Sequence, residues 1–178
     1  MAFQQVPLSQ LRPDFVRSIR EDWMLVTAGT PERLGTMTIS WGFCGFVWDM
    51  DAVLVLIRAS RNTLPYLLEN PRFTLASFPA EYRDKLYYCG RHSGRDVDKA
   101  AVCGFTAVEE ADLPGAPYFS QAEKVYICRK LYVGDVHEAG FADASPSPVF
   151  HQWYELGEHA GDMHRLFVAQ VERALVKS

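Results

Sequence analysis

Short strand-like segments recur along almost the whole sequence, and no other feature restricts the fold as much. They are rich in β-branched and aromatic residues or alternate strictly between polar and apolar side chains, and Gly or Pro separates many of them. The segments are residues 23–28, 36–41, 43–48, 52–58, 72–78, 105–108, 125–136 and 166–175. No helix-length segments alternate regularly with them, as a βαβ arrangement would require. The pattern therefore predicts a mainly β fold, a largely antiparallel β-barrel with short helices.

Helical signals are fewer and shorter than the strand signals. Residues 7–19 have a broken amphipathic spacing, and residues 81–88 form a short candidate that we expect to end at Gly90. Residues 63–69 can form about two turns, with Thr63 as the N-cap. We expect these helices to lie on the barrel rather than to form a layer of their own.

The whole chain, residues 1–178, is expected to form a single domain. Its length suits one domain, and a hydrophobic fraction of 48% is enough for a core without disulfides or metals. Residues 140–148 are the one long loop-like stretch. Strand-like sequence continues beyond it, so we interpret it as an excursion within the domain.

Charge and cysteine usage exclude several classes of protein. A net charge of -4 argues against a nucleic-acid binder, which needs a basic face. The longest apolar run, residues 52–57, is too short to cross a membrane, and the first residues do not resemble a secretory signal. The cysteines form no C-x-x-C pair, so we expect free thiols in a reducing cytoplasm. They are Cys44, Cys89, Cys103 and Cys128.

The sequence offers no motif for a metal site or for hydrolytic catalysis. His159 and His164 are five positions apart, which would place them on different faces of a helix. A G-x-S-x-G nucleophile elbow is absent as well. We therefore expect no protein-held metal and no catalytic side chain of the hydrolase type.

The strand-like segment 36–41 is the first candidate binding element. Side chains alternate across a strand, so its hydroxyl groups share one face and its apolar groups share the other. The hydroxyl face could meet the polar edge of a flat heterocycle, or it could simply face water. The two faces consist of Thr36, Thr38 and Ser40 on one side and Met37, Ile39 and Trp41 on the other.

Two further segments could bind an anion. Residues 58–63 join a strand to a helix start, where free amides, a hydroxyl and an arginine suit a phosphate. The alternative is a capped helix with two solvated arginines. Residues 89–99 could wrap a polar ligand or could form a flexible surface loop with paired charges. The candidates are Arg58, Ser60, Arg61, Asn62 and Thr63, followed by Cys89, Arg91, Ser93, Gly94, Arg95, Asp96 and Lys99.

Taken in order, these segments resemble a known family. Residues 23–29, 36–41, 58–63, 73–78 and 89–99 are similar to the flavin reductase-like, FMN-binding split-barrel proteins, including flavoredoxin-like members. The resemblance is good over residues 20–107 and only general from Glu109 onward. One departure is Gly35, because many members carry Asn before the Thr-Met-Thr run.

The resemblance implies a six-stranded Greek-key split barrel, a homodimer and bound FMN. Thr36, Thr38 and Ser40 would line the edge of the isoalloxazine. The phosphate would lie on Arg58, Ser60, Arg61 and Thr63, and residues 93–99 would close over the cofactor, either from the same chain or from the neighbouring subunit. The full expected cofactor-binding set is Thr36, Met37, Thr38, Ile39, Ser40, Trp41, Arg58, Ser60, Arg61, Asn62, Thr63, Cys89, Ser93, Gly94, Arg95, Asp96 and Lys99.

The resemblance also implies the reaction. An oxidoreductase of the flavin reductase type would pass hydride or electrons from NAD(P)H through bound flavin to a flavin, small-molecule or protein acceptor. Two alternatives stay open: an FMN electron-transfer protein without NAD(P)H activity of its own, and a flavinless barrel that binds another small ligand.

Overall fold

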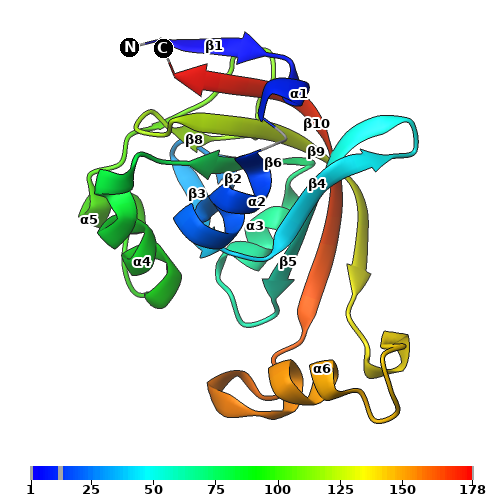
Figure 1. The fold of residues 1–178 in the computed structure, drawn as a ribbon. Coiled ribbons are helices and arrows are strands. Elements are labelled where there is room, and N and C mark those ends of the chain that lie inside the picture. The colour runs from blue at the N-terminus through cyan, green and yellow to red at the C-terminus, as the bar shows by residue number, and fades with distance from the viewer. Residues whose placement is uncertain (1, 12–13, 178) are drawn as a thin grey trace.

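A computed structural model describes residues 2–11 and 14–177 and shows a mostly antiparallel β architecture (Figure 1). The main sheet joins eight strands in the order β3-β2-β6-β9-β10-β5-β4, with β1 paired to β10. A separate pair joins β7 to β8. The strands are β1 Phe3–Val6, β2 Met24–Thr30, β3 Arg33–Ile39, β4 Gly42–Val47, β5 Met50–Arg58, β6 Arg72–Ser77, β7 Ala107–Val108, β8 Tyr118–Phe119, β9 Lys124–Asp135 and β10 His164–Lys177.

The helices are short, as the sequence predicts. The α-helices are α1 Leu8–Leu11, α2 Phe15–Arg17, α3 Thr63–Glu69, α4 Arg83–Arg91, α5 Lys99–Cys103 and α6 Pro148–Phe150. Turns of 3-10 helix cover Ala80–Tyr82, Glu138–Gly140 and Gly157–His159, and π-helical turns cover Ser18–Asp22 and His151–Glu155. None of the helices within the described ranges has the length and apolar run that a membrane span requires.

The predicted β fold with short helices is confirmed, but the predicted count of six strands is not. The main sheet has eight strands. Two of them lie at its margins: β1 pairs with β10, and β4 pairs with β5 as the outer strand of a hairpin. In the described chain no ladder joins β3 to β4, so the path of hydrogen bonds stays open between these two ends.

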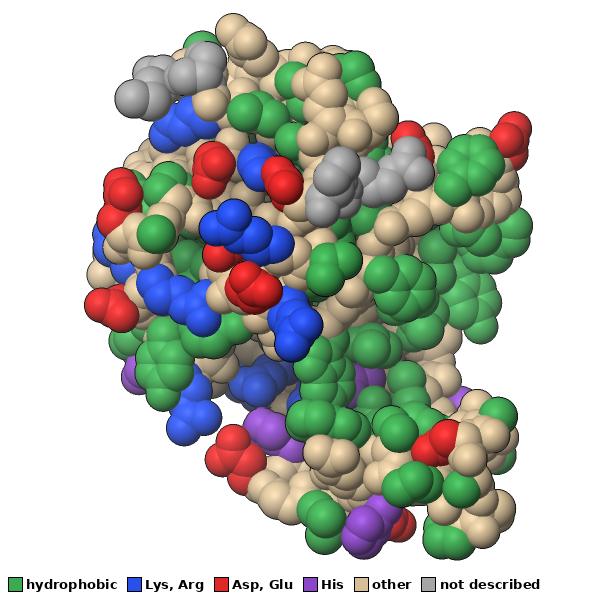
Figure 2. Space-filling view, viewed as in Figure 1, with side chains coloured by type: hydrophobic (Ala, Val, Ile, Leu, Met, Phe, Trp, Pro, Cys, Tyr) green, Lys and Arg blue, Asp and Glu red, His purple; other side chains and the backbone are tan. Residues whose placement is uncertain are grey.

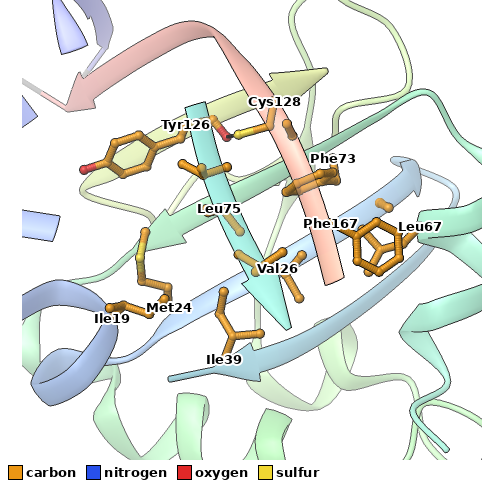
Figure 3. Close-up of a cluster of buried hydrophobic side chains, with 14 of the residues drawn as sticks. Ile19, Met24, Val26, Ile39, Leu67, Phe73, Leu75, Tyr126, Cys128 and Phe167 are labelled. Atoms are coloured by element: carbon orange, nitrogen blue, oxygen red, sulfur yellow. Dashed lines mark hydrogen bonds between the residues drawn. The ribbon is translucent and has the colours of Figure 1, made fainter. Parts of the chain in front are cut away.

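The main core fills the inside of the curved sheet. Figure 3 shows part of this cluster, which includes Met24 and Val26 from β2, Leu75 from β6, Tyr126 from β9 and Phe167 from β10. All five side chains are fully buried. Burial of this kind contributes about 1.5–3 kcal/mol per large apolar side chain, which makes the sheet a rigid frame for the loops.

A second core lies on the outer face of the same strands. Alternation turns Leu25 of β2 and Ile127 of β9 away from the main core, and both pack with Leu86 and Cys89 of α4 and with Cys103 of α5. Both faces of β2 and β9 are therefore buried over these positions. Residues 92–98 connect α4 to α5 and so lie next to this layer.

Two predicted helix boundaries are wrong. Asn62, not Thr63, is the N-cap of α3; Thr63 is the first helical residue, and its side chain is buried. Helix α4 does not end at Gly90 but continues through Arg91. A Cβ at Gly90 would lie 3.3 Å from Cβ of Thr38. The glycine therefore allows α4 to approach β3 closely and does not serve as a helix cap.

Residues 136–163, between β9 and β10, form a lobe that projects from the barrel (Figure 1, with α6). Asp162 binds this lobe to the end of β5. Its carboxylate accepts hydrogen bonds from the Ser60 amide at 3.0 Å and the Ser60 hydroxyl at 2.6 Å, and its carbonyl accepts one from Arg58 Nη1 at 2.6 Å. The predicted excursion at residues 140–148 is thus part of a longer segment that returns to the barrel.

Candidate functional site

Three adjacent pockets lie where β3, the start of α3, the α4–α5 loop and the 136–163 lobe meet. We call them the strand-end pocket (about 330 Å³), the cation pocket (about 120 Å³) and the outer pocket (about 410 Å³). Met37 and Arg61 line both the strand-end pocket and the cation pocket. Asn62, Gly94, Arg95 and Lys99 line both the cation pocket and the outer pocket. The three pockets are therefore neighbours that share parts of their walls, and we call them together the groove.

The cation pocket is strongly positive. Arg61, Arg91, Arg95 and Lys99 line it, and its described lining contains no Asp or Glu. Ser60, Thr63 and Ser93 add hydroxyl groups to the same lining. Arg91 also pairs with Glu158, which lies outside this lining, at 3.7 Å. The other three basic side chains create a potential that favours an anion.

Arg61 has a donor that the described part of the chain leaves unused. Its Nη1 donates to the Gly90 carbonyl at 3.4 Å, whereas its Nε is buried without a hydrogen-bond partner. A buried donor without an acceptor costs free energy, and native proteins rarely leave one unsatisfied. The Nε therefore needs an acceptor that the described residues do not supply, and either a water molecule or a ligand oxygen can supply it.

Lys99 also points a charge into the pockets. Its Nζ donates to the Thr36 carbonyl at 2.9 Å and to the Cys89 carbonyl at 2.7 Å, and the residue is 7% exposed. Burial lowers the pKa of Lys99, and the nearby Arg61 guanidinium lowers it further. An ammonium has three N–H donors, so one remains for a ligand after the two carbonyls are satisfied.

Aromatic side chains surround the strand-end pocket. The Trp41 ring lies 4.8 Å from the Trp153 ring in an edge arrangement and 5.1 Å from the His164 ring. Arg58 lies behind them, with its guanidinium 6.0 Å from Trp41 and 5.7 Å from Tyr154. Figure 2 shows a hollow between the main body and the lower lobe, with Lys, Arg and His side chains gathered along it.

His164 is held neutral at the edge of this pocket. Its Nδ1 lies 2.9 Å from the Tyr154 hydroxyl, and the residue is buried. Burial lowers the pKa of His164 to about 4, and the Arg58 charge adds to the effect. The ring therefore presents one N–H donor and one acceptor, and no charge, at neutral pH.

Every residue of the predicted cofactor-binding set lines one of the three pockets. Residues Met37, Thr38, Ile39, Ser40, Trp41 and Arg58 line the strand-end pocket. The residues from Ser60 to Thr63, with Cys89, Ser93, Gly94, Arg95 and Lys99, line the cation pocket. Thr36 and Asp96 line the outer pocket only. The α4–α5 loop reaches this groove from the same chain.

Several of these side chains have different partners from those expected. The Thr36 hydroxyl lies 2.9 Å from the Thr27 hydroxyl and donates to the Val26 carbonyl at 3.2 Å. The Thr38 hydroxyl donates to the Leu86 carbonyl of α4. The hydroxyls of Thr36 and Thr38 therefore make structural contacts with neighbouring elements, while both residues also line a pocket.

Arg58 also differs from its expected role on the phosphate. It is 8% exposed and lines the strand-end pocket rather than the cation pocket. Its guanidinium donates to the Asp162 and Trp153 carbonyls at 2.6 and 3.3 Å. Arg58 fastens the lobe to the barrel, since two of its donors are committed to carbonyls there.

Sequence reasoning missed the residues that the lobe and β10 bring to the groove. Trp153, His159 and His164 line the strand-end pocket together with Leu56. His159 lies in a 3-10 turn and His164 begins β10. The expectation that the two histidines would lie on different faces of one helix is therefore wrong. The described residues contain no group of three or more ligands that could hold a metal.

Two cysteines also meet in space without a close pair in the sequence. Cys89 Sγ lies 3.8 Å from Cys103 Sγ in the second core, and both are free thiols. Burial raises the pKa of Cys89 to about 12, and the neighbouring Cys103 raises it further. These thiols behave as packing groups, because a buried thiol with a raised pKa is a poor nucleophile.

Gly35 has a structural explanation. A Cβ at this position would lie 2.5 Å from Cδ2 of Tyr66, so the Tyr66 ring occupies the space that a side chain would need. Tyr66 and Arg33 line the outer pocket with Gly35. The ring of Tyr66, from α3, thus occupies the space that an Asn side chain would take in other family members.

Comparison with known proteins gives a consistent result. The sequence model of the flavin reductase like domain matches residues 16–178. No curated protein matches the sequence. Among solved structures, an FMN-binding domain of flavin reductases-like enzyme from Shewanella baltica is similar with a TM-score of 0.67 and 16% identity, over 98% of this chain and 77% of that one.

Two further solved structures show the same fold. Flavoredoxin from Methanosarcina acetivorans has a TM-score of 0.65 and 18% identity, over 88% of this chain and 69% of that one. An FMN-binding protein from Thermus thermophilus has a TM-score of 0.65 and 24% identity, over 98% of this chain and 80% of that one.

Proposed function

Because the chain belongs to the flavin reductase-like family, we propose that it binds FMN in the groove and acts as an oxidoreductase of the flavin reductase type. The cation pocket would hold the phosphate, and the strand-end pocket would hold the isoalloxazine. The relatives with similar structures that are named as FMN-binding proteins or flavoredoxins support this choice of cofactor.

The cation pocket is the observation that carries the proposal. Three of its four basic residues, Arg61, Arg95 and Lys99, have no ion pair among the described residues, whereas Arg91 pairs with Glu158 at 3.7 Å. The buried Arg61 Nε also lacks an acceptor there. A phosphate supplies both a double negative charge and acceptor oxygens. Arg61, Arg95 and Lys99 would hold it, with Ser93 and Thr63 as hydroxyl partners.

The strand-end pocket fits a flat ring system. Its lining includes apolar Met37 and Ile39 from β3 and the Trp41 ring, and it is open to the hollow below the barrel. Trp153 of the lobe packs edge-on against the Trp41 ring at 4.8 Å and lines the same pocket. Neutral His164 offers a hydrogen bond without adding a charge beside a redox centre.

When bound, FMN would supply two-electron chemistry, taking a hydride from NAD(P)H and passing electrons to an acceptor. The chain's part is to orient the two planar molecules and to keep water from the space between them. No dinucleotide-binding fingerprint occurs in the sequence, so we expect NAD(P)H to bind transiently in the open strand-end pocket.

We also propose that the protein is a homodimer. The β4–β5 hairpin exposes Phe43, Phe46, Val47 and Trp48, which line a largely apolar depression of about 250 Å³ together with Val168. Figure 2 shows hydrophobic side chains gathered on this projecting edge. Exposed apolar patches of this kind mark protein interfaces, and the resemblance to the family led us to expect a dimer.

The experiment is an anaerobic titration of the FMN-loaded protein with NADH and with NADPH, followed by flavin absorbance. We expect one of them to bleach the flavin at a rate that saturates with concentration. A flavin that dithionite reduces but neither nicotinamide does would instead indicate an electron-transfer protein. Failure to bind FMN at micromolar concentrations would overturn the proposal, since the cation pocket would then serve another ligand.

A further inference from the structure

Two buried thiols lie in contact between α4 and α5, and the proposed flavin chemistry uses neither of them. Cys89 Sγ, in the last turn of α4, lies 3.8 Å from the Sγ of Cys103, the last residue of α5. Residues 92–98 join the two helices and carry Ser93 and Arg95 of the cation pocket. We propose that Cys89 and Cys103 form a disulfide under oxidising conditions and that this bond clamps the segment 92–98. The inference goes beyond the proposed function and does not depend on it.

The pair needs only a small adjustment to form the bond. The two sulfurs are already in contact, and they must approach by roughly 1.8 Å more to reach the length of a disulfide bond. Rotation of the two side chains and a shift of α5 can supply this approach. Helix α5 has only five residues, and Gly104 ends it in a left-handed conformation, so it can move without a long element moving with it.

The surroundings of the pair suit a slow oxidation and not a catalytic step. Burial raises the pKa of Cys89 to about 12, while the charge of Lys99, whose Nζ donates to the Cys89 carbonyl at 2.7 Å, opposes this rise. In the reduced protein the thiols therefore act as packing groups. Because the thiolate is the reacting form, we expect the disulfide to form over minutes to hours in excess oxidant.

Cys103 is the residue of the pair that an oxidant reaches first. It is 4% exposed, whereas Cys89 is completely buried. Its neighbour Val102 is 59% exposed, so α5 lies at the surface, where local opening is easiest. Hydrogen peroxide is the oxidant that we name, because it is small and uncharged and can approach a thiol that larger reagents cannot reach.

The reaction balances with one hydrogen peroxide for each pair. The Cys103 sulfur attacks a peroxide oxygen, the O–O bond breaks, and the thiol proton leaves with the released hydroxide as water. The Cys89 sulfur then attacks the sulfenic acid on Cys103, so that the S–S bond forms and the S–O bond breaks. The hydroxide of the sulfenic acid leaves with the Cys89 proton as a second water. Two thiols thus lose two electrons, and the peroxide gains them.

The disulfide would close the chain from residue 89 to residue 103 into a loop that contains the segment 92–98. A cross-link of this kind removes freedom from the opened chain and so stabilises the closed form. Arg95 lies within the loop and is exposed, which makes it a cleavage site for trypsin. Its rate of cleavage therefore reports how often the segment opens.

Thiol titration of the unfolded chain before and after peroxide treatment tests the inference. The chain has four cysteines, and we expect peroxide to remove two thiols and dithiothreitol to restore both. Peptide mapping should join Cys89 to Cys103. Trypsin should cut after Arg95 about threefold more slowly, or slower still, in the oxidised protein.

Two results would overturn the disulfide: no loss of thiols, or a bond between other cysteines. A disulfide between Cys89 and Cys103 that leaves the cleavage rate unchanged would overturn the clamp. These measurements need no flavin, so their failure would leave the proposed function intact.

Alanine variants assign the thiols. Cys103→Ala should lose no pair of thiols reversibly, and peroxide followed by mapping should find no disulfide at Cys89. Cys44→Ala removes the partly buried thiol of β4 and is the matched control, so it should still lose two thiols. A reversible loss of two thiols in Cys103→Ala would overturn the inference, because another pair would then account for it.

Discussion

Arg61 presents a buried Nε without an acceptor to a pocket that four basic residues line. If a phosphate satisfies this donor, Arg61→Ala should weaken FMN binding by about ten- to a hundredfold, because a charge-assisted hydrogen bond contributes about 1.5–3 kcal/mol. Riboflavin lacks the phosphate, so its affinity should barely change. Arg61→Lys should restore only part of the loss, since it lacks the planar fork. Quenching of flavin fluorescence measures both affinities.

The matched control is Arg165→Ala, which removes an arginine that pairs with Asp135 at 3.0 Å and lines none of the three pockets. It should leave both affinities unchanged. If Arg61→Ala weakens both flavins equally, Arg61 acts on folding rather than on the phosphate. If it weakens neither, the phosphate lies elsewhere, and Arg95 is the next residue to test.

His164 makes stability depend on pH in a predictable direction. Its pKa falls from 6.5 to about 4 on folding, mainly through burial, so the unfolded chain binds a proton between these values and the native protein does not. The free energy of unfolding should therefore be unaffected above about pH 7 and fall by about 2 kcal/mol as the pH drops to about 5. Urea denaturation at the two pH values measures the change.

His164→Gln separates this group from the carboxylates that titrate in the same range. The variant keeps a polar side chain near the Tyr154 hydroxyl but cannot take up a proton. Its stability should fall less between the two pH values than that of the wild type. If the two proteins lose stability in parallel as the pH falls, the pKa of His164 does not differ between the native and unfolded states, and the prediction is wrong.

At the scale of elements, the contact between β3 and α4 holds the groove in shape. The Thr38 hydroxyl donates to the Leu86 carbonyl, and Gly90 allows the helix to lie close to the Thr38 side chain. The end of α4 leads directly into Arg91, Ser93 and Arg95 of the cation pocket. The position of the phosphate site therefore depends on a strand–helix contact as well as on its own side chains.

Thr38→Val tests this dependence. The change keeps the shape and the strand preference but removes the donor to Leu86, so the free energy of unfolding should fall by about 1 kcal/mol. Thr38→Ser keeps a hydroxyl and should lose less. Thermal or urea denaturation of the apo protein gives the comparison. An unchanged stability in Thr38→Val would mean that the hydroxyl bond to α4 adds nothing beyond packing.

The elements that the sequence predicts well are those whose pattern is local. Strict alternation identified β3, and the β-branched run of residues 52–58 identified most of β5, because one or both faces of these strands must be buried. Strands β1 and β8 were not predicted. They are short, with four and two residues, and their pairing with β10 and β7 decides their conformation.

The parts of the site that were not predicted depend on contacts between distant residues. Trp153 meets Trp41 only because residues 136–163 fold back across the end of β5. The ring of Tyr66 fills the space above Gly35 through the packing of α3 on β3. Neither contact leaves a periodic or compositional signal, since each residue alone looks like an ordinary core or surface aromatic.

At the scale of the whole molecule, the β4–β5 hairpin exposes several large hydrophobic side chains close together. Phe43 and Phe46 are 61% and 65% exposed, and Trp48 at the tip is 59% exposed. Trp48 and Asp49 both have positive φ angles, 52° and 59°, in the turn between the strands. Glycine or asparagine fits such a turn better, so a tryptophan there costs conformational energy. An exposed, strained aromatic at a hairpin tip suits a surface that becomes buried on assembly.

A homodimer formed through this hairpin should dissociate when a charge is placed in it. We expect the wild type to be a dimer at micromolar concentration and Phe46→Glu to be a monomer, because a buried carboxylate without a partner costs several kcal/mol at an interface. Val102→Lys, at an exposed valine of α5, is the control and should leave the dimer intact. Light scattering gives the mass, and circular dichroism checks that the monomer is folded, as it should be because Phe46 belongs to neither core cluster. A wild type that is monomeric with FMN bound would contradict the dimer, and the hairpin would then be an exposed surface for a different partner.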